Sequence, residues 1–291
     1  MAEIFKGLVC NDEIALTVIK STDIVNKAIG YFDLSPVAAA ALGRTLSICS
    51  MMGYELKGEK DYLTAVINGG GDIGIITVTA SSSGNVKGYV TNPHVESHIN
   101  SFGKLDVAKA VGVDGKLTVI KNLGLKDPYV GTSDLVSGEI AEDFANYFAT
   151  SEQTPCGVAL GVKIGKDGDC LSAGGIFASV LPFASEESIS AFEKVFSSLS
   201  NVSALMDGKS AEAFAQETFA SLGLRKIDSA SCGYVCDCSK DKIDKVLISL
   251  SKQDVDELIA ERGCVEVVCQ FCNKKYVYDK QQAYEVCGFE K

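Results

Sequence analysis

The sequence Cys236-Asp237-Cys238-Ser239, followed thirty residues later by Cys269-Gln270-Phe271-Cys272, decides how the C-terminal part of this chain folds. Two thiolates three residues apart across a tight turn can bind one zinc ion at about 2.3 Å. In an extended segment, side chains two residues apart lie on the same face, so the first pair can approach the same ion. A closed four-thiolate site for one Zn²⁺, without an open position for a substrate, is therefore predicted at Cys236, Cys238, Cys269 and Cys272.

The eleven cysteines of this 291-residue chain are unevenly distributed, because seven of them lie between Cys232 and Cys287. The N-terminal stretch interleaves charged and apolar residues and lacks the apolar core of a secretory signal. No stretch approaches the roughly 20 apolar residues of a membrane helix, so we expect a cytoplasmic protein without membrane contact. Cytosolic thiols are kept reduced, and a dense cysteine cluster there favours a metal site over a disulfide framework.

The formal net charge of −11 bears on which partners the chain can bind. A negative surface repels the phosphate backbone, whose neutralisation drives non-specific binding to nucleic acids. No basic stripe compensates for this charge. We therefore expect no nucleic-acid partner, although small zinc ribbons often have one.

The change in cysteine density predicts three parts. Residues 1–182 are expected to form an α+β core domain with an antiparallel sheet, residues 183–230 a helical linker, and residues 231–291 a small zinc domain. Strands and helices do not alternate regularly, which favours α+β over a doubly wound sheet. About sixty residues make too small a core to rely on burial alone, so a metal would supply folding free energy to the last part.

Local patterns predict the elements of the core domain. Ser35-Pro36 is a typical helix start, and the Ala- and Leu-rich stretch 37–56 behind it is predicted to be a long buried helix. Gly- and Ser-rich turns separate three strands of a predicted antiparallel meander. The meander strands are 62–67, 73–80 and 85–90, and the other predicted elements are a helix at 139–150, a hairpin of 158–164 with 170–181, a strand at 276–278 and a helix at 280–286.

The stretch from Ser185 to Leu224 has apolar residues at helical spacing, among many Ser and Ala residues. Phe192, Phe196 and Phe214 are among them. The pattern predicts amphipathic, thinly packed helices. Taken alone, it favours a plain structural connection.

Three further patterns resemble functional motifs, and a simpler structure explains each. The glycines of Gly69-x-Gly71-x-x-Gly74 precede a β-branched strand instead of a helix, so they predict a hairpin turn and no dinucleotide site. His94 and His98 have metal-binding spacing, but Pro93 beside them favours a surface loop. Glu139 and Asp143 suit the first turn of a helix, where the dipole favours anions, better than an acid–base pair.

Spacing alone leaves two purposes open for the four thiols. Only thiolates bind the metal, so oxidation of either pair would remove two ligands and destabilise the small domain. Each close pair is also its own disulfide partner, and a strained ring of this kind belongs to the labile, regulatory class. The alternative is a purely structural zinc ribbon with a binding role, which spacing by itself favours.

The cysteine pairs and several upstream stretches resemble the heat-shock protein 33 family, also called the 33 kDa chaperonin. The likeness runs in order along nearly the whole chain. The stretches that carry it are Leu42-Gly43-Arg44, Lys87-Gly88-Tyr89-Val90, Asn92-Pro93, Ser137 to Asp143, Ser151-Glu152-Gln153, Ala173-Gly174-Gly175, Leu181-Pro182, the two cysteine pairs and Tyr276.

This resemblance implies a stress-activated holdase chaperone and no enzyme. The reduced form would hold zinc and be inactive, and peroxide or hypochlorous acid, together with heat, would release the zinc. The implied disulfides are Cys236–Cys238 and Cys269–Cys272. The zinc domain and linker would then unfold and bind unfolding client proteins. The oxidised form would be a homodimer, and clients would pass to ATP-dependent foldases.

The resemblance also changes the interpretation of the linker and leaves three cysteines unassigned. The linker would be a metastable element folded against the meander. In the reduced state the linker would cover an apolar patch of the N-terminal sheet. Cys232, Cys264 and Cys287 are extra to the family pattern. Cys232 lies four residues before Cys236 and could compete for its disulfide.

Overall fold

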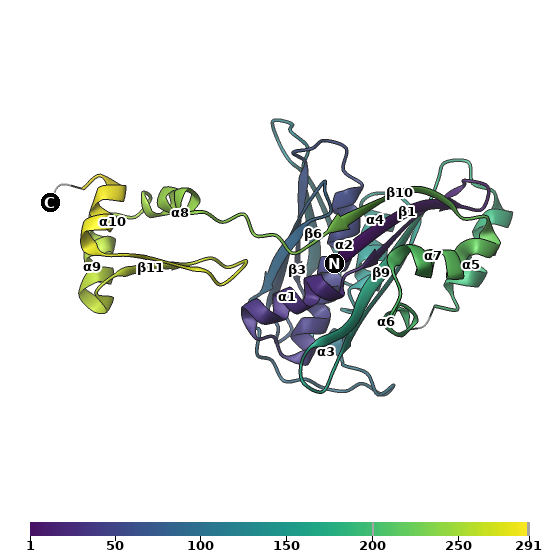
Figure 1. The fold of residues 1–291 in the computed structure, drawn as a ribbon, viewed down its shortest axis with the longest axis horizontal. Coiled ribbons are helices and arrows are strands. Elements are labelled where there is room, and N and C mark those ends of the chain that lie inside the picture. The colour runs from purple at the N-terminus through teal and green to yellow at the C-terminus, as the bar shows by residue number, and fades with distance from the viewer. Residues whose placement is uncertain (200, 290–291) are drawn as a thin grey trace. The chain divides into compact units, whose positions relative to one another are not determined.

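The computed structural model describes residues 1–199 and 201–289, which form two compact units, Met1–Val235 and Cys236–Lys291 (Figure 1). None of the described helices is long and apolar enough to cross a membrane. The elements of the first unit are β1 (Ala2–Val9), β2 (Ile14–Lys20), α1 (Thr22–Phe32), α2 (Pro36–Tyr54), β3 (Tyr62–Asn68), β4 (Ile75–Ser81), β5 (Val86–Val90), α3 (Val107–Val111), β6 (Lys116–Asn122), β7 (Tyr129–Asp134), α4 (Ala141–Thr150), β8 (Cys156–Ile164), β9 (Cys170–Val180), α5 (Glu186–Phe196), α6 (Val202–Leu205), α7 (Ala211–Phe219), η1 (Ala220–Leu222) and β10 (Arg225–Cys232).

Helix α2 is the centre of the first unit. It begins at Pro36 after Ser35, as the sequence predicts, and sixteen of its nineteen residues are buried. A helix that is apolar on all sides has to be enclosed. It packs against β3, β4 and β5 of one sheet and against β2, β8 and β9 of another, so small residues such as Gly53 are needed where a strand passes close. A Cβ atom on Gly53 would lie 2.5 Å from the carbonyl oxygen of Ser81.

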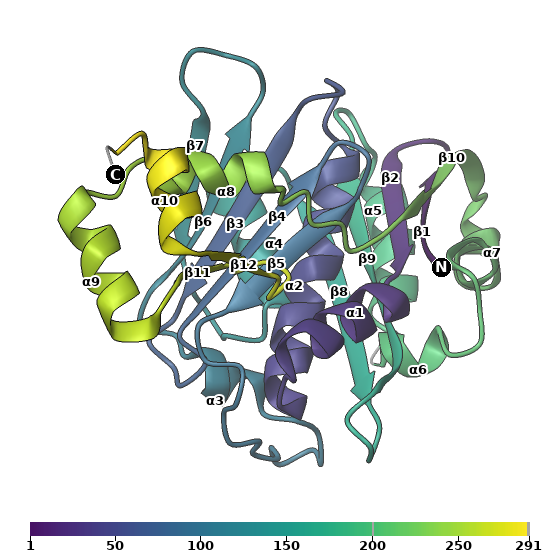
Figure 2. The ribbon, with the colours of Figure 1, turned by 60° about the vertical axis from the view of Figure 1, so that its left-hand side comes forward.

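The first sheet has the order β5-β4-β3-β6-β7 and is antiparallel throughout (Figure 2). The predicted meander of three strands is confirmed as its β3-β4-β5 half. Asn68 pairs with Ile75, and the glycines between them form the hairpin turn predicted in place of a nucleotide site. The α+β fold class is therefore confirmed.

The second sheet has the order β10-β1-β2-β9-β8. Its β8–β9 hairpin is the predicted one. The strand β10 was not predicted, because Arg225, Lys226 and Asp228 leave it without an alternation of apolar and polar residues, and only its last residue is buried. It is nevertheless paired with β1 over its whole length, from Cys232 opposite Ala2 to Arg225 opposite Leu8.

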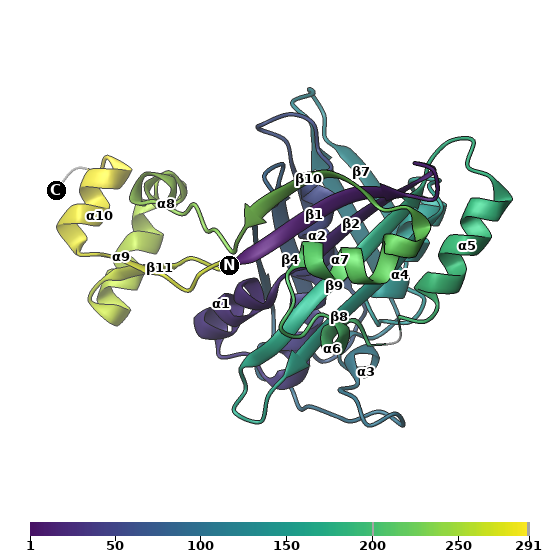
Figure 3. The ribbon, with the colours of Figure 1, turned by 45° about the vertical axis from the view of Figure 1, so that its right-hand side comes forward.

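The predicted linker helices exist as α5, α6, α7 and η1, which we call the linker layer (Glu186–Leu222). They pack on the second sheet (Figure 3), so the expectation that they fold against the meander is wrong. Phe192, Phe214 and Phe219 are buried there together with side chains from β1, β2 and β9, such as Leu16 and Ile176. The outer face of β1 and β2 is fully apolar at Phe5, Val9, Leu16 and Val18, whereas the meander presents threonines outward.

The second unit is a small module with a core of its own. Its elements are α8 (Lys240–Leu247), α9 (Lys252–Arg262), β11 (Val265–Val268), β12 (Lys275–Tyr278) and α10 (Lys280–Cys287). Gly263 ends α9 with a φ of 74°, a left-handed conformation that glycine adopts readily at the end of a helix. The predicted strand at 276–278 and the closing helix are present as β12 and α10.

Candidate metal centre

Cys269 and Cys272 lie in the turn between β11 and β12, which pair antiparallel from Val265 to Val268. The carbonyl oxygen of Cys269 accepts hydrogen bonds from the N–H of Cys272 (3.4 Å) and of Asn273 (2.8 Å). Asn273 has a φ of 57°, which an asparagine tolerates better than most residues. The turn therefore folds back on its own backbone and brings both thiols to one side.

Cys236 and Cys238 lie in the extended segment directly before α8. Ser239 caps that helix by accepting a hydrogen bond from the N–H of Lys242. One Sγ atom from each of the four cysteines lies within 4.8 Å of the others. The structure thus brings together all four residues that the sequence predicted as metal ligands.

The sulfur separations fit a metal with four thiolate ligands. A tetrahedral ion with bonds of about 2.3 Å places its sulfurs roughly 3.8 Å apart. Two of the distances here are 3.6 Å, between the Sγ atoms of Cys236 and Cys269, and 3.4 Å, between those of Cys238 and Cys272. No carboxylate or imidazole belongs to the cluster, and a set of four sulfurs suits Zn²⁺ or another thiophilic ion.

The thiols have unequal affinities for protons. Burial raises the pKa of Cys236, and neighbouring thiols add to that effect. Burial also acts on Cys238, but hydrogen bonds from Tyr276 and the neighbouring thiols lower its pKa to about 7. The hydroxyl of Tyr276 donates to Sγ of Cys238 over 3.2 Å, and the same bond raises the pKa of Tyr276. The lowered pKa favours the thiolate form of Cys238, and only thiolates bind zinc or attack peroxide.

Known proteins resemble this chain in sequence and in fold. A family model described as "Hsp33 protein" matches residues 3–279. The chain belongs to the Hsp33 family. A 33 kDa chaperonin of Alkaliphilus metalliredigens is 45% identical over 97% of both chains, and one of Caldanaerobacter subterraneus subsp. tengcongensis is 42% identical over the same shares. The crystal structure of the 33 kDa chaperonin of Thermotoga maritima matches with a TM-score of 0.90 at 33% identity and covers 98% of this chain and 97% of its own.

The three extra cysteines of this Hsp33-family chain have different surroundings. Cys232 belongs to β10 and is buried in the core around α2, where burial raises its pKa to about 11. Cys287 packs inside the module, and its Sγ donates to the carbonyl oxygen of Leu247. Cys264 is half-buried at the start of β11. None of the three is among the four clustered sulfurs, and the neutral, enclosed thiol of Cys232 is a poor competitor for Cys236.

The remaining candidates of the sequence belong to the first unit, whereas the four sulfurs belong to the second. His94 and His98 lie in an irregular segment, and the imidazole of His98 lies 3.9 Å from the carboxylate of Glu96. Glu139 was expected in the first turn of a helix, but it precedes α4, which begins at Ala141. Its carboxylate forms an ion pair with Arg44, at 2.5 Å. Asp143 is fully buried and accepts four backbone N–H groups, from residues 136, 137, 138 and 140. It therefore organises the start of α4 and has no catalytic partner.

Proposed function

We propose that this chain is a redox-regulated holdase chaperone, inactive while reduced and zinc-loaded, which binds unfolding proteins after oxidation. The observation that carries the proposal is the cluster of four sulfurs within 4.8 Å in a module with a very small core. Membership of the Hsp33 family, whose relatives are named chaperonins, supports the chaperone part. The proposed activity is binding, and no catalytic group is assigned.

The proposed metal is one Zn²⁺ held by Cys236, Cys238, Cys269 and Cys272. When bound, the ion would supply about 10 kcal/mol or more of folding free energy. The buried core of the module consists of only eight residues, one of which is Cys269 itself. A core of this size rarely stabilises a small domain alone. Loss of the thiolates should therefore unfold the module.

Oxidation is proposed to act on the thiols. Two thiols lose two electrons and two protons as a disulfide forms, and one hydrogen peroxide molecule is reduced to two waters. The proposed pairs are Cys236–Cys238 and Cys269–Cys272. In the folded module Cys236 also lies 3.6 Å from Cys269, and Cys238 3.4 Å from Cys272, between their Sγ atoms, so contacts across the two pairs compete with contacts within them. We infer that pairing between sequence neighbours is completed as the module unfolds.

Unfolding of the module is proposed to spread along the chain through β10. This strand lies between the module and the linker layer in sequence, and only Cys232 at its end is buried. It is otherwise attached by backbone bonds to β1 and by exposed ion pairs, such as Arg225 with Asp12. A strand attached in this way opens at little free-energy cost compared with a core strand.

Release of the linker layer would expose the surface that binds clients. Phe5, Leu16 and Ile176 of the second sheet and Phe192 and Phe214 of the linker layer are buried against one another. Their separation would leave two apolar surfaces, and large exposed apolar patches bind other proteins. The same surfaces suit the homodimer proposed for the oxidised form, and clients are proposed to pass to ATP-dependent foldases. Neither a nucleic acid nor a membrane is a proposed partner.

The decisive experiment follows zinc and chaperone activity in one sample. Reduced, zinc-loaded protein is treated with peroxide at raised temperature, with a chromophoric chelator and an aggregating, chemically unfolded client present. We expect zinc release and suppression of aggregation to rise together, while heat without oxidant gives neither. Zinc release without suppression would leave the site as a structural zinc ribbon. Mass spectrometry of the oxidised protein identifies the disulfide pairs.

Limited proteolysis tests the linker independently. Cleavage between residues 185 and 230 should be slow in the reduced protein and fast after peroxide and heat, because the linker layer becomes accessible. Equal cleavage rates in both states would rule out its release.

A further inference from the structure

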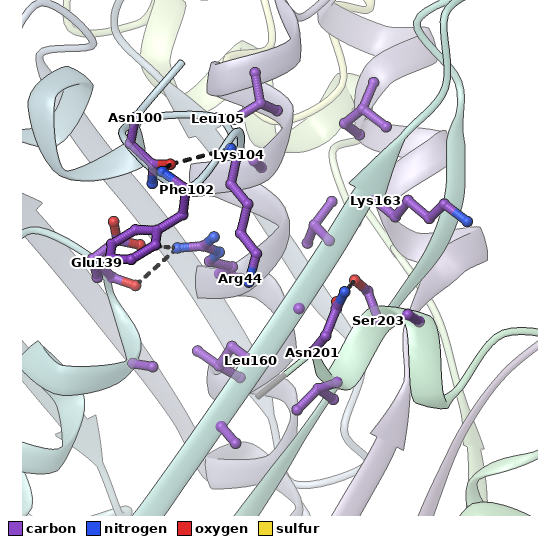
Figure 4. Close-up of a pocket in the computed structure, with 18 of the residues that line it drawn as sticks. Arg44, Asn100, Phe102, Lys104, Leu105, Glu139, Leu160, Lys163, Asn201 and Ser203 are labelled. Carbon is purple, nitrogen blue, oxygen red and sulfur yellow. Dashed lines mark hydrogen bonds and ion pairs between the residues drawn. The ribbon is translucent and has the colours of Figure 1, made fainter. Parts of the chain in front are cut away.

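A groove of about 1050 Å³ lies within the first unit, and all the residues that line it belong to that unit. One wall is formed by the segment Ile99–Leu105 and by the residues before and at the start of α4, and the other wall by Asn201, Val202 and Ser203 of the linker layer (Figure 4). We call it the edge groove. Its floor contains every residue of β8 from Val158 to Ile164. Successive residues of a strand point to opposite faces, so a groove that reaches all seven has to run along the edge of the strand.

The strand β8 is the last strand of the second sheet, with β9 as its only neighbour. Among the described residues, no backbone group of Val158–Lys163 has a hydrogen-bond partner other than β9. The edge is therefore a row of N–H and C=O groups that another strand can bind. Proteins usually protect such edges with charges, prolines or short length. The strand has nine residues, no proline and a single charge, Lys163, whereas the opposite edge strand β10 carries Arg225, Lys226 and Asp228.

The rim of the groove is apolar and positively charged. Phe102 and Ile99 are 84% and 62% exposed on the first wall. Four basic residues line the groove against two acidic ones, Glu139 and Glu142, in a chain with a net charge of −11. Arg44 and Lys163 are paired with Glu139 and Asp207. Within the described part of the chain, Lys104 and Lys166 have no ion-pair partner, so they are available to an acidic occupant.

The backbone beside the groove is strained. Ile140 is buried and has a φ of 68°, which is an outlier for a β-branched residue. It is held there by Asp143, which accepts its N–H. In this conformation the carbonyl oxygen and the carboxylate of Glu139 both accept hydrogen bonds from Nη1 of Arg44, at 3.2 and 2.5 Å. Strained residues of this kind persist mainly at functional sites, and here the strain fixes one wall of the groove.

We propose that the edge groove binds an extended polypeptide segment with apolar and acidic side chains, which adds to β8 as a sixth strand. Backbone hydrogen bonds to β8 supply affinity without requiring a sequence, and the rim residues Phe102, Lys104 and Lys166 supply the preference for apolar and acidic side chains. The inference rests on the proposed holdase function for the identity of the ligand, an unfolded protein. Because the groove is open in this structure, a short segment binds to the reduced protein as well.

The first test uses reduced, zinc-loaded, full-length protein and a fluorescent heptapeptide that alternates valine and glutamate. Its affinity is compared with that of two isomers, N-methylated at alternate positions along one edge or along the other. Strand addition requires one isomer to bind at least tenfold more weakly while the other keeps its affinity. Equal binding of the peptide and both isomers, or no binding of any, would overturn the proposal.

The second test changes the rim. The double variant Lys104→Glu/Lys166→Glu should bind the glutamate peptide roughly tenfold more weakly and a lysine analogue more tightly. The matched control is Lys57→Glu/Lys60→Glu, an equal charge change at exposed lysines outside the groove. An equal loss of peptide affinity in both double variants would show that the overall electrostatic field of the protein attracts the peptide. It would refute a site at β8.

The third test locates a real client. Benzoylphenylalanine at position 102 should crosslink to a chemically unfolded client after activation by peroxide and heat, whereas the same probe at Phe183, which is fully exposed outside the groove, should not. Suppression of aggregation without peptide binding or crosslinking at position 102 would overturn the proposal that the edge groove binds peptides, and the proposed holdase function would stand. Peptide binding without any suppression of aggregation after oxidation would overturn the proposed holdase function, and the proposal for the groove would stand.

Discussion

The helix α2 and the linker layer contain similar small and apolar residues but are buried to very different extents. Sixteen of nineteen residues are buried in α2, which lies between two sheets. In α5 only Ser188 and Phe192 of eleven residues are buried, and the layer touches one sheet from one side. An element enclosed on both sides cannot leave without unfolding the unit, whereas a one-sided layer with a few aromatic anchors can detach while its support stays folded.

The C-terminal module takes this contrast further. The core of the module has eight buried residues among the described ones, and one of them, Cys269, is a ligand of the proposed zinc. We therefore expect the module to be folded only while its thiols are reduced. The thiols of the first unit are buried or, at Cys156, half-buried, and this burial raises the pKa of Cys156 and of Cys170 to about 12, which keeps them neutral. Neutral thiols react slowly with peroxide. Oxidation should therefore act on the module and spare the core.

The largest effect is expected from removal of two proposed ligands. In Cys269→Ser/Cys272→Ser the module should lose about 10 kcal/mol or more of folding free energy and be unfolded under all conditions. Hydrogen exchange should show complete loss of protection in α8–α10 and unchanged protection in α2. The control, Cys264→Ser, removes a thiol outside the sulfur cluster and should leave the module folded. Retained protection in the double variant would mean that the module does not depend on a metal.

The next effect separates the two helical regions. Phe214→Ala removes a fully buried anchor of the linker layer and should destabilise it by about 3–5 kcal/mol. We expect this variant to suppress client aggregation partly without any oxidant. Leu46→Ala in α2 should destabilise the unit by about 2–5 kcal/mol and give no such activity, because α2 cannot detach alone.

The control for both variants is Phe183→Ala, whose ring is fully exposed. Aggregation assays and thermal unfolding are measured on all three. Activity of Leu46→Ala equal to that of Phe214→Ala would remove the distinction between an enclosed helix and a detachable layer.

The sequence predicted the four thiols and the enclosed helix because both depend on local spacing. The turn from Cys269 to Cys272 brings its two thiols to one side, and Val37–Gly53 has no polar face to expose. It did not predict which sheet supports the linker layer, because that depends on pairing between β2 and β9 and between β1 and β10, strands that lie far apart in the chain. The edge groove was missed for the same reason. The one feature of the sequence that pointed to the groove was Arg44, a charged residue in the apolar helix α2.

A smaller effect is expected where the linker layer sits closely on glycines. A Cβ atom at Gly161 of β8 would lie 2.5 Å from the backbone nitrogen of Ser203 in α6. Gly161→Val should therefore lift α6 from the sheet, at about 1–3 kcal/mol of overpacking, and lower the temperature at which peroxide activates the protein. The measurement is the aggregation assay at a series of temperatures.

The matched control is Gly30→Ala in α1, where a Cβ atom meets no other atom within 4 Å and the helix gains slightly in stability. Activation of Gly161→Val at the temperature of the parent protein would show that α6 does not restrain the switch.

The smallest effect is expected at the ion pair that attaches β10. The side chain of Arg225 donates to both carboxylate oxygens of Asp12, at 3.0 and 2.7 Å, and this hydrogen bonding lowers the pKa of Asp12. A lowered pKa in the folded state means that the contribution to stability is present above the unfolded pKa of about 3.9 and is lost as the pH falls through the folded pKa. Since both groups are exposed, that contribution is small and is screened by salt.

Arg225→Ala should therefore raise the pKa of Asp12 towards its ordinary value, as a carboxyl NMR titration would show. It should also speed hydrogen exchange in β10 slightly at pH 7, and the difference from the parent protein should vanish below the folded pKa of Asp12. Lys27→Ala, a change at an exposed lysine in α1, should leave both observables unchanged. If β10 exchanges as slowly in Arg225→Ala as in the parent at low salt and pH 7, the ion pair of Arg225 with Asp12 contributes nothing to the attachment of β10, which then depends on its backbone bonds to β1 and on the pair of Lys226 with Glu212.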